Sequence, residues 1–123
     1  MTSSPGSRFA RWDVVLVPFP YTERAQAKVR PAVIMSTTAL ATATGMHYVA
    51  MITNAAHRPW VGDVAISDLH VAGLPVASVV RPAKIATIDQ QALIRKIGSL
   101  PRVDRARVAA SIRKFLAFRI EAS

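Results

Sequence analysis

A few polar residues stand at the ends of apolar segments, where a folded chain could bring them together to act on a phosphate group. Arg30 opens one β-branched apolar segment, Thr53 and Asn54 end another, and Arg81 lies inside a third. A guanidinium is costly to bury unpaired, so each arginine must reach water, a carboxylate or a phosphate. The pattern therefore points to anion binding or to structural ion pairs.

Arg81 and Trp60 each have a structural interpretation beside the functional one. The residues alone favour an ion pair of Arg81 with Asp13 or Asp63 over a role in binding. Trp60, next to Arg58, could stack on an unpaired nucleic-acid base or could close one end of the core. Both interpretations of Trp60 stay open.

Most common catalytic and metal-binding patterns are missing from the sequence. The three histidines, His47, His57 and His70, show no metal-ligand spacing, and there is no cysteine. No phosphate-binding glycine motif and no nucleophile-elbow motif are present. We therefore expect neither a metal nor a cofactor.

Composition favours one basic domain that meets a polyanion. The chain has 123 residues, 51% hydrophobic, with 16 Lys and Arg against 7 Asp and Glu, for a net charge of +9. Such a charge is typical of nucleic-acid binding or of an acidic protein partner. The sequence predicts no membrane span and fits a cytoplasmic location. We expect a flexible N-terminal tail over residues 1–10 and one domain over residues 11–123.

The elements that must position these residues are mostly short strands. Breaks at Pro, Gly and polar clusters separate the apolar segments. Strands are expected at residues 12–17, 31–36 (with Pro31 confined to the first position), 47–54, 63–67 and 77–88, the last broken or bulged at Pro82. Connections are expected at residues 21–29, 37–46, 55–62 and 68–75, and residues 93–100 fit either a strand or a helix.

The C-terminal segment is predicted to be an amphipathic helix that begins after Pro101. Its stripe, which must pack on the sheet, comprises Val108, Ile112, Phe115, Leu116 and Arg119. Short strands followed by one helix indicate an α+β, mainly β fold, a small barrel or sandwich with a helix on its face.

Four segments, in order and with matching spacing, resemble the MazF/PemK toxin family. They cover the chain from Trp12 to Phe118 and are WDVVLVPFPYTERAQAKVRPAVIMS (residues 12–36), ITN (52–54), SVVRPAKIATID (78–89) and IRKIGSL (94–100) before a terminal helix. The resemblance implies a small SH3-like β-barrel (CcdB/MazF-like) that dimerises. It also implies a toxin of a type II toxin–antitoxin system that cleaves single-stranded RNA sequence-specifically without a metal and so inhibits translation.

The resemblance assigns catalytic roles to Arg30 and Thr53, and substrate binding at the RNA site to Arg81. Arg can donate two hydrogen bonds to phosphate oxygens and Thr a third, which suits stabilisation of a phosphorane. Neither side chain is a good proton shuttle, so the general base is unassigned, with His57 and Tyr21 as candidates. The further substrate-binding residues that we expect are Trp60, Arg58, Asn54 and Tyr21.

The sequence departs from the family pattern at three places. Trp12 stands where many members have Gly, so the first turn must be built differently, and Ala83 stands where some members have an acid. The loop over residues 21–28 lacks the histidine that some members place there. A mechanism that needs those groups is therefore not expected.

Two other functions remain open beside the endoribonuclease. One is a CcdB-like toxin that binds DNA gyrase through its C-terminal helix, and the other is a nucleic-acid-binding barrel without catalysis. The expected partners of the enzyme are single-stranded RNA, a second copy of the chain and a cognate, acidic antitoxin. The 51% hydrophobic composition agrees with a homodimer because it leaves apolar surface to cover.

Overall fold

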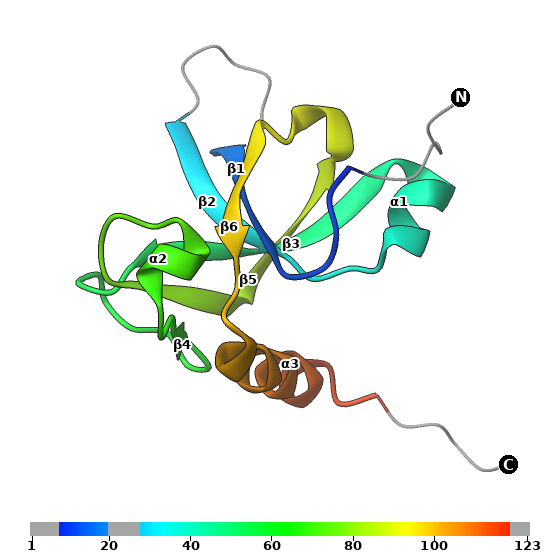
Figure 1. Cartoon of the computed structure of the whole chain (residues 1–123). Coiled ribbons are helices and arrows are strands. Elements are labelled where there is room, and N and C mark those ends of the chain that lie inside the picture. Colours follow the sequence, from blue (N-terminus) through cyan, green and yellow to red (C-terminus); the bar gives the residue numbers. More distant parts are fainter. Residues whose placement is uncertain (1–7, 20–27, 119–123) are drawn as a thin grey trace, which may run out of the picture.

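The computed structural model describes residues 8–19 and 28–118, which form one curled antiparallel sheet with helices at its margins (Figure 1). The strand order is β4-β5-β3-β2-β1-β6, so β4 and β6 are the two edges. The strands are β1 (Asp13–Phe19), β2 (Lys28–Ile34), β3 (Met46–Asn54), β4 (Val64–Ala65), β5 (Ser78–Asp89) and β6 (Arg95–Ser99). The helices are α1 (Thr38–Thr44), α2 (Leu69–Ala72), the 3-10 turn η1 (Gln90–Ala92) and α3 (Arg102–Leu116). This confirms the predicted α+β, mainly β fold.

The curled sheet buries apolar residues on both of its faces. Successive residues of a strand point to opposite faces, and Val14 and Val15 of β1 accordingly belong to two different core clusters. One cluster includes Val108 of α3, and the other includes Phe9, which is only 6% exposed. The remainder of the expected N-terminal tail, residues 1–7, lies outside the described part of the chain.

The first two predicted strands are confirmed, but the position of Pro31 in the second was wrong. Pro31 is the fourth residue of β2, opposite Leu16 of β1, and is not its first. Pairing of β2 with β3 begins only at Ala32, so at Pro31 one side of β2 has no strand partner. A proline is tolerated there because it interrupts no ladder on that side.

The turn before β1 contains a tryptophan in a backbone conformation that favours glycine. Trp12 has φ +77°, in the left-handed region that costs an L-residue roughly 1–2 kcal/mol. Its backbone N–H donates to Ile34 O at 2.8 Å and its carbonyl accepts from Leu100 N at 2.8 Å. Backbone hydrogen bonds to β2 and to Leu100, directly after β6, therefore hold this turn.

The prediction of a break at Pro82 is confirmed, and the break is large. Ala50 of β3 lies opposite Ile85, whereas the next residue, Met51, lies opposite Arg81. The three residues between Arg81 and Ile85 therefore bulge out of the ladder, as a residue without a backbone N–H requires.

Two connections contain helices that we did not predict. The Thr- and Ala-rich segment over residues 37–46 forms α1, which ends at Gly45 in the left-handed conformation with φ +75°. The link over residues 68–75 contains α2, where the Asp68 carboxylate accepts from Val71 N. Residues 93–100, for which a strand and a helix were both open, form β6.

The C-terminal helix α3 begins after Pro101, as predicted, and packs beside β4 and β5 (Figure 1). Val108 is fully buried and Ile112 packs on the same cluster. Farther along, Phe115 is 43% exposed with its ring against Gly62, and Leu116 is 54% exposed, so the end of the predicted stripe is only partly covered; Arg119 lies outside the described residues. No helix within residues 8–19 and 28–118 is long and apolar enough to cross a membrane.

Candidate active site

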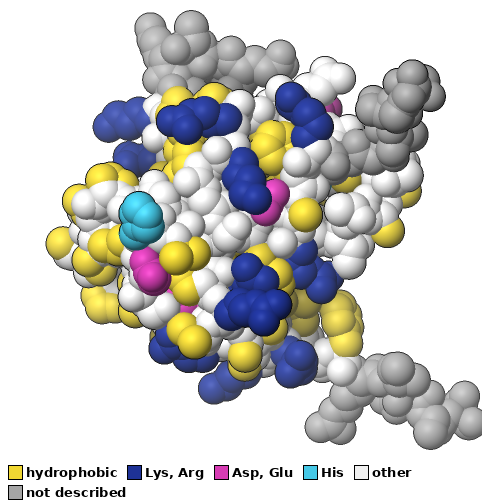
Figure 2. All heavy atoms as spheres, in the orientation of Figure 1, with side chains coloured by type: hydrophobic (Ala, Val, Ile, Leu, Met, Phe, Trp, Pro, Cys, Tyr) yellow, Lys and Arg dark blue, Asp and Glu magenta, His cyan; other side chains and the backbone are white. Residues whose placement is uncertain are grey.

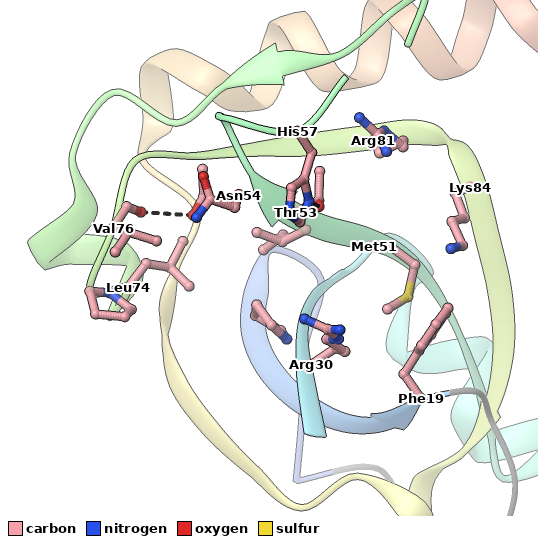
Figure 3. A pocket seen from close by; sticks show the side chains of 14 residues that line it. Phe19, Arg30, Met51, Thr53, Asn54, His57, Leu74, Val76, Arg81 and Lys84 are labelled. Carbon is pink, nitrogen blue, oxygen red and sulfur yellow. Dashed lines mark hydrogen bonds between the residues drawn. The ribbon is translucent and has the colours of Figure 1, made fainter. Parts of the chain in front are cut away.

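An open cleft of about 460 Å³ lies where β2 separates from β3, and β5 and two loops complete its wall (Figure 3). Three of its lining residues are cationic and none is a carboxylate. The lining residues are Phe19, Arg30, Pro31, Met51, Ile52, Thr53, Asn54, His57, Leu74, Pro75, Val76, Ser78, Arg81 and Lys84.

The end of the β2–β3 ladder brings Arg30 and Thr53 to the same cleft. The last pair on this side is Ala32 with Met51, and continuing that register by two residues would set Arg30 opposite Thr53. Because the two strands are no longer paired there, the space between them stays open and both side chains line it. Arg30 is exposed and Thr53 is half-buried, so the guanidinium and the hydroxyl are accessible to a solute in the cleft.

Thr53 also contacts a histidine from the following loop. Thr53 Oγ1 and His57 Nδ1 are 2.8 Å apart, and the imidazole lies beside the Thr53 side chain in Figure 3. Asn54 shapes this loop, because its side-chain oxygen accepts from Ala56 N at 2.8 Å and its backbone oxygen from His57 N at 3.0 Å. Of the two candidate bases, His57 therefore lies in the cleft, and Tyr21 lies outside the described residues.

Arg81 lines the cleft but is also committed to structural contacts. Its Nε and Nη2 donate to the two oxygens of Asp63 at 3.1 and 3.0 Å, and Nη2 also donates to Arg58 O at 2.9 Å. The guanidinium carbon lies 4.4 Å from the centroid of the Trp60 ring. The alternative of an ion pair with Asp63 is therefore the arrangement observed.

The electrostatics of Asp63 follow from that pairing. Burial by itself would raise the pKa of Asp63, but the hydrogen bond from Arg81, the backbone N–H of Trp60 and the charge of Arg81 outweigh it. The pKa of the carboxyl group therefore lies below its ordinary value, and Asp63 stays ionised beside Arg81.

The other expected binding residues are distributed around the cleft. Trp60 is 44% exposed and Arg58 is exposed; both lie on the loop between β3 and β4, next to the cleft lining rather than in it. Asn54 belongs to the lining.

Sequence reasoning missed Lys84 and Phe19. Lys84 Nζ lies 4.3 Å from the centroid of the Phe19 ring, and both side chains line the cleft. Lys84 lies in the bulge that contains Pro82. The only feature of the sequence that pointed to this position was the proline. Among the described residues, no group of three or more His, Cys, Asp or Glu could hold a metal ion.

Comparison with known proteins gives one family and a set of similar structures. Residues 10–116 match the family model described as PemK-like, MazF-like toxin of type II toxin–antitoxin system. No curated protein sequence matches the chain.

Three solved structures show the same fold. MazF from Deinococcus radiodurans is 20% identical, with a TM-score of 0.71 over 89% of this chain and 97% of that one. The Mycobacterium tuberculosis toxin MazF-mt6 is 23% identical, with a TM-score of 0.69 over 88% and 99%. An endoribonuclease in complex with its cognate antitoxin, from a mycobacterial species, is 16% identical, with a TM-score of 0.71 over 92% and 99%.

Proposed function

The chain belongs to the PemK-like, MazF-like toxins of type II toxin–antitoxin systems, and on that premise we propose that it is a metal-independent, sequence-specific endoribonuclease. Its substrate is single-stranded RNA in the cytoplasm, and cutting mRNA inhibits translation. The observation that carries the proposal is a cleft with three cationic side chains, no carboxylate and a hydroxyl group beside them. Such a site attracts a phosphodiester and does not favour a metal cation.

Arg30 and Thr53 are the catalytic residues of this proposal. In RNA cleavage the 2′-oxygen attacks phosphorus and negative charge builds on the non-bridging oxygens. The Arg30 guanidinium donates to those oxygens as a fork, and the Thr53 hydroxyl adds one more donor from the opposite strand. Donors that are already in place stabilise the transition state without reorganisation.

RNA binding would extend from the cleft onto the neighbouring loop. Trp60 offers an exposed ring for stacking on an unpaired base, and Arg81 supports that ring from one face. The side-chain oxygen of Asn54 is used within the loop, which leaves its amide group to donate to RNA. Arg58 supplies charge at the rim, whereas the expected contribution of Tyr21 concerns a residue outside the described part of the chain.

The proposed partners are a cognate antitoxin and a second copy of the chain. One of the similar solved structures is a MazF, and another is an endoribonuclease in complex with its cognate antitoxin. With a net charge of +9, this chain would bind an acidic antitoxin segment that competes with RNA. The exposed apolar side chains of Leu116, at the end of α3, and of Phe118, two residues farther on, agree with a covered surface in a homodimer.

The test is incubation of the purified protein with a long mixed-sequence RNA in EDTA, followed by mapping of the cut sites. The wild type should give discrete cuts, and Arg30→Ala should lower the rate by about 100-fold or more, as expected for loss of a preorganised charge donor. Thr53→Ala should also lower the rate, by about 10-fold or more on the same principle.

Two variants outside the cleft serve as matched controls. Arg102→Ala on α3 and Thr87→Ala on β5 remove exposed side chains of the same types and should leave the cutting rate unchanged. Intact RNA with the folded, antitoxin-free wild type would contradict the proposal. Binding of DNA gyrase or of uncut RNA would then point to the alternative functions.

A further inference from the structure

The contact between His57 and Thr53 joins the proposed catalytic hydroxyl to a group that can carry a proton. The two side chains meet at 2.8 Å between Nδ1 and Oγ1, and both line the cleft (Figure 3). His57 is exposed, so the far edge of its imidazole ring is open to a bound substrate. An imidazole is the side chain best suited to exchange protons near neutral pH.

The loop that carries His57 is anchored at both of its ends. At the β3 end, Asn54 accepts hydrogen bonds from Ala56 N and His57 N. At the β4 end, Arg81 holds Arg58 O and both oxygens of Asp63. The imidazole is therefore presented from a fixed backbone, as a catalytic group requires.

The hydrogen-bonding capacity of Thr53 decides which imidazole nitrogen faces the substrate. A threonine hydroxyl has one hydrogen, and in the proposed function it donates that hydrogen to a phosphate oxygen. Thr53 Oγ1 must then accept from His57, so the hydrogen of the neutral imidazole is on Nδ1. Nε2, on the opposite side of the ring, keeps its lone pair and can accept a proton.

On this basis we propose that His57 is the general base of the cleavage reaction, an inference that rests on the proposed endoribonuclease function. Nε2 takes the proton of the 2′-hydroxyl, and the freed electron pair on the 2′-oxygen forms the bond to phosphorus. The bond from phosphorus to the 5′-oxygen breaks, and that oxygen leaves with the bonding pair and takes a proton from water. The products are a 2′,3′-cyclic phosphate and a 5′-hydroxyl end, and His57 returns its proton to solvent.

From β5, Arg81 supports the loop that carries His57, because its side chain donates hydrogen bonds to Arg58 O and to Asp63. Among the described residues, the charged groups that face the cleft with His57 are Arg30 from β2 and Arg81 and Lys84 from β5.

The decisive variant is His57→Asn, compared with the wild type by single-turnover cleavage of RNA in EDTA between pH 5 and 9. An asparagine amide can still donate to Thr53 from nearly the position of Nδ1 but places nothing at Nε2. We expect a loss of about 100-fold or more, the usual contribution of a general base. The wild-type rate should rise with pH, because only the neutral imidazole can accept the proton of the 2′-hydroxyl, and the variant should lose that rise.

Two further variants separate proton transfer from structure. His57→Ala should regain activity when imidazole is added, in proportion to the unprotonated imidazole, whereas a purely structural role gives no such rescue. His70→Asn, which changes an exposed histidine on α2, should behave as the wild type.

The failures of the two proposals are distinguishable. If the wild type cuts RNA and His57→Asn keeps the rate or the rising limb of the pH profile, the assignment of His57 is wrong while the endoribonuclease stands. If the folded wild type cuts no RNA, the proposed function is wrong and the assignment of His57 falls with it.

Discussion

The guanidinium of Arg81 lies between a carboxylate, a backbone carbonyl and an aromatic ring. The Arg81 side chain is 9% exposed, and that of Asp63, which pairs with it, is 11% exposed. A charge in such a place is tolerated because its partner and its hydrogen bonds replace the water it has lost. Removing the partner would leave the cation buried and uncompensated.

Asp63→Asn should therefore destabilise the fold by about 3 kcal/mol at neutral pH, as broken buried ion pairs do. Since the pKa of Asp63 is lowered in the folded state, its contribution is present above the unfolded value and is lost as the pH falls through the folded one. The difference between wild type and variant should accordingly shrink below about pH 4. Urea unfolding of both proteins at several pH values measures this difference in the free energy of unfolding.

Asp68→Asn is the matched control, because this exposed carboxylate caps α2 and pairs with no cation among the described residues. This substitution should lower the free energy of unfolding by a few tenths of a kcal/mol at most, since asparagine caps helices about as well as aspartate. A loss at Asp63→Asn equally small, or one independent of pH, would show that the pair with Arg81 contributes little.

These contacts mark the limit of sequence reasoning about single residues. The pattern offered Asp13 or Asp63 as partners of Arg81, and only the pairing of β4 with β5 selects Asp63, while Asp13 pairs with Lys96 at 3.1 Å. Arg30 and Thr53 line one cleft, and their catalytic roles stay a prediction. The His57 contact depends on the path of a loop, which residue types alone do not determine.

Among the elements, β3 supplies the most cleft-lining residues, Met51 to Asn54, and the bulge of β5 interrupts the β3–β5 ladder beside them. Pro82 within β5 was readable in the sequence, so a break there could be predicted. The size of the bulge and the position of the Lys84 side chain in the cleft could not be predicted, because both depend on the register of β5 against β3. Helix α1 was missed for a related reason, since Thr-rich segments have low helix propensity and tertiary packing decides their state.

Helix α3 is fastened to the sheet by a buried carboxylate. Asp104, in the first turn, has no exposed surface and accepts hydrogen bonds from Ser67 N at 2.9 Å and Ser67 Oγ at 3.0 Å. It also pairs with Arg107 of the same helix. The carboxylate thus joins α3 to the segment after β4 and lies near the positive end of the helix dipole.

Asp104→Ala should lower the free energy of unfolding by about 3 kcal/mol, because it leaves buried donors unsatisfied and a small cavity. Asp89→Ala provides the comparison: this exposed carboxylate accepts from Gln91 N, and its loss should cost only about 1 kcal/mol. Denaturant unfolding of both variants measures the difference. Equal losses would mean that the buried position of Asp104 adds nothing.

At the scale of the whole molecule, charge is the property that governs encounter with RNA. Lys and Arg side chains are spread over the face that carries β6 and α3 (Figure 2), and three cationic side chains line the cleft on β2 and β5. A net charge of +9 raises the rate of encounter with any polyanion, whereas only the charges that touch phosphates release counterions on binding. The salt dependence of binding therefore separates the cleft from the general surface.

RNA affinity should fall as the salt concentration rises, and the slope of log K against log salt should come from the cationic side chains of the cleft. Arg81 is already paired with Asp63, so neutralising about two phosphates, by Arg30 and Lys84, predicts a slope near −1.4 in log K against log salt, and so about 7-fold weaker binding between 50 and 200 mM salt. Fluorescence anisotropy with an RNA whose 2′-hydroxyls are methylated, and which therefore cannot be cut, measures this slope. Arg30→Ala and Lys84→Ala should each reduce the slope by about 0.7, whereas Arg113→Ala on the exposed side of α3 should not. If all three substitutions reduce the slope equally, RNA is bound by the surface as a whole, and the cleft is not where the phosphates lie.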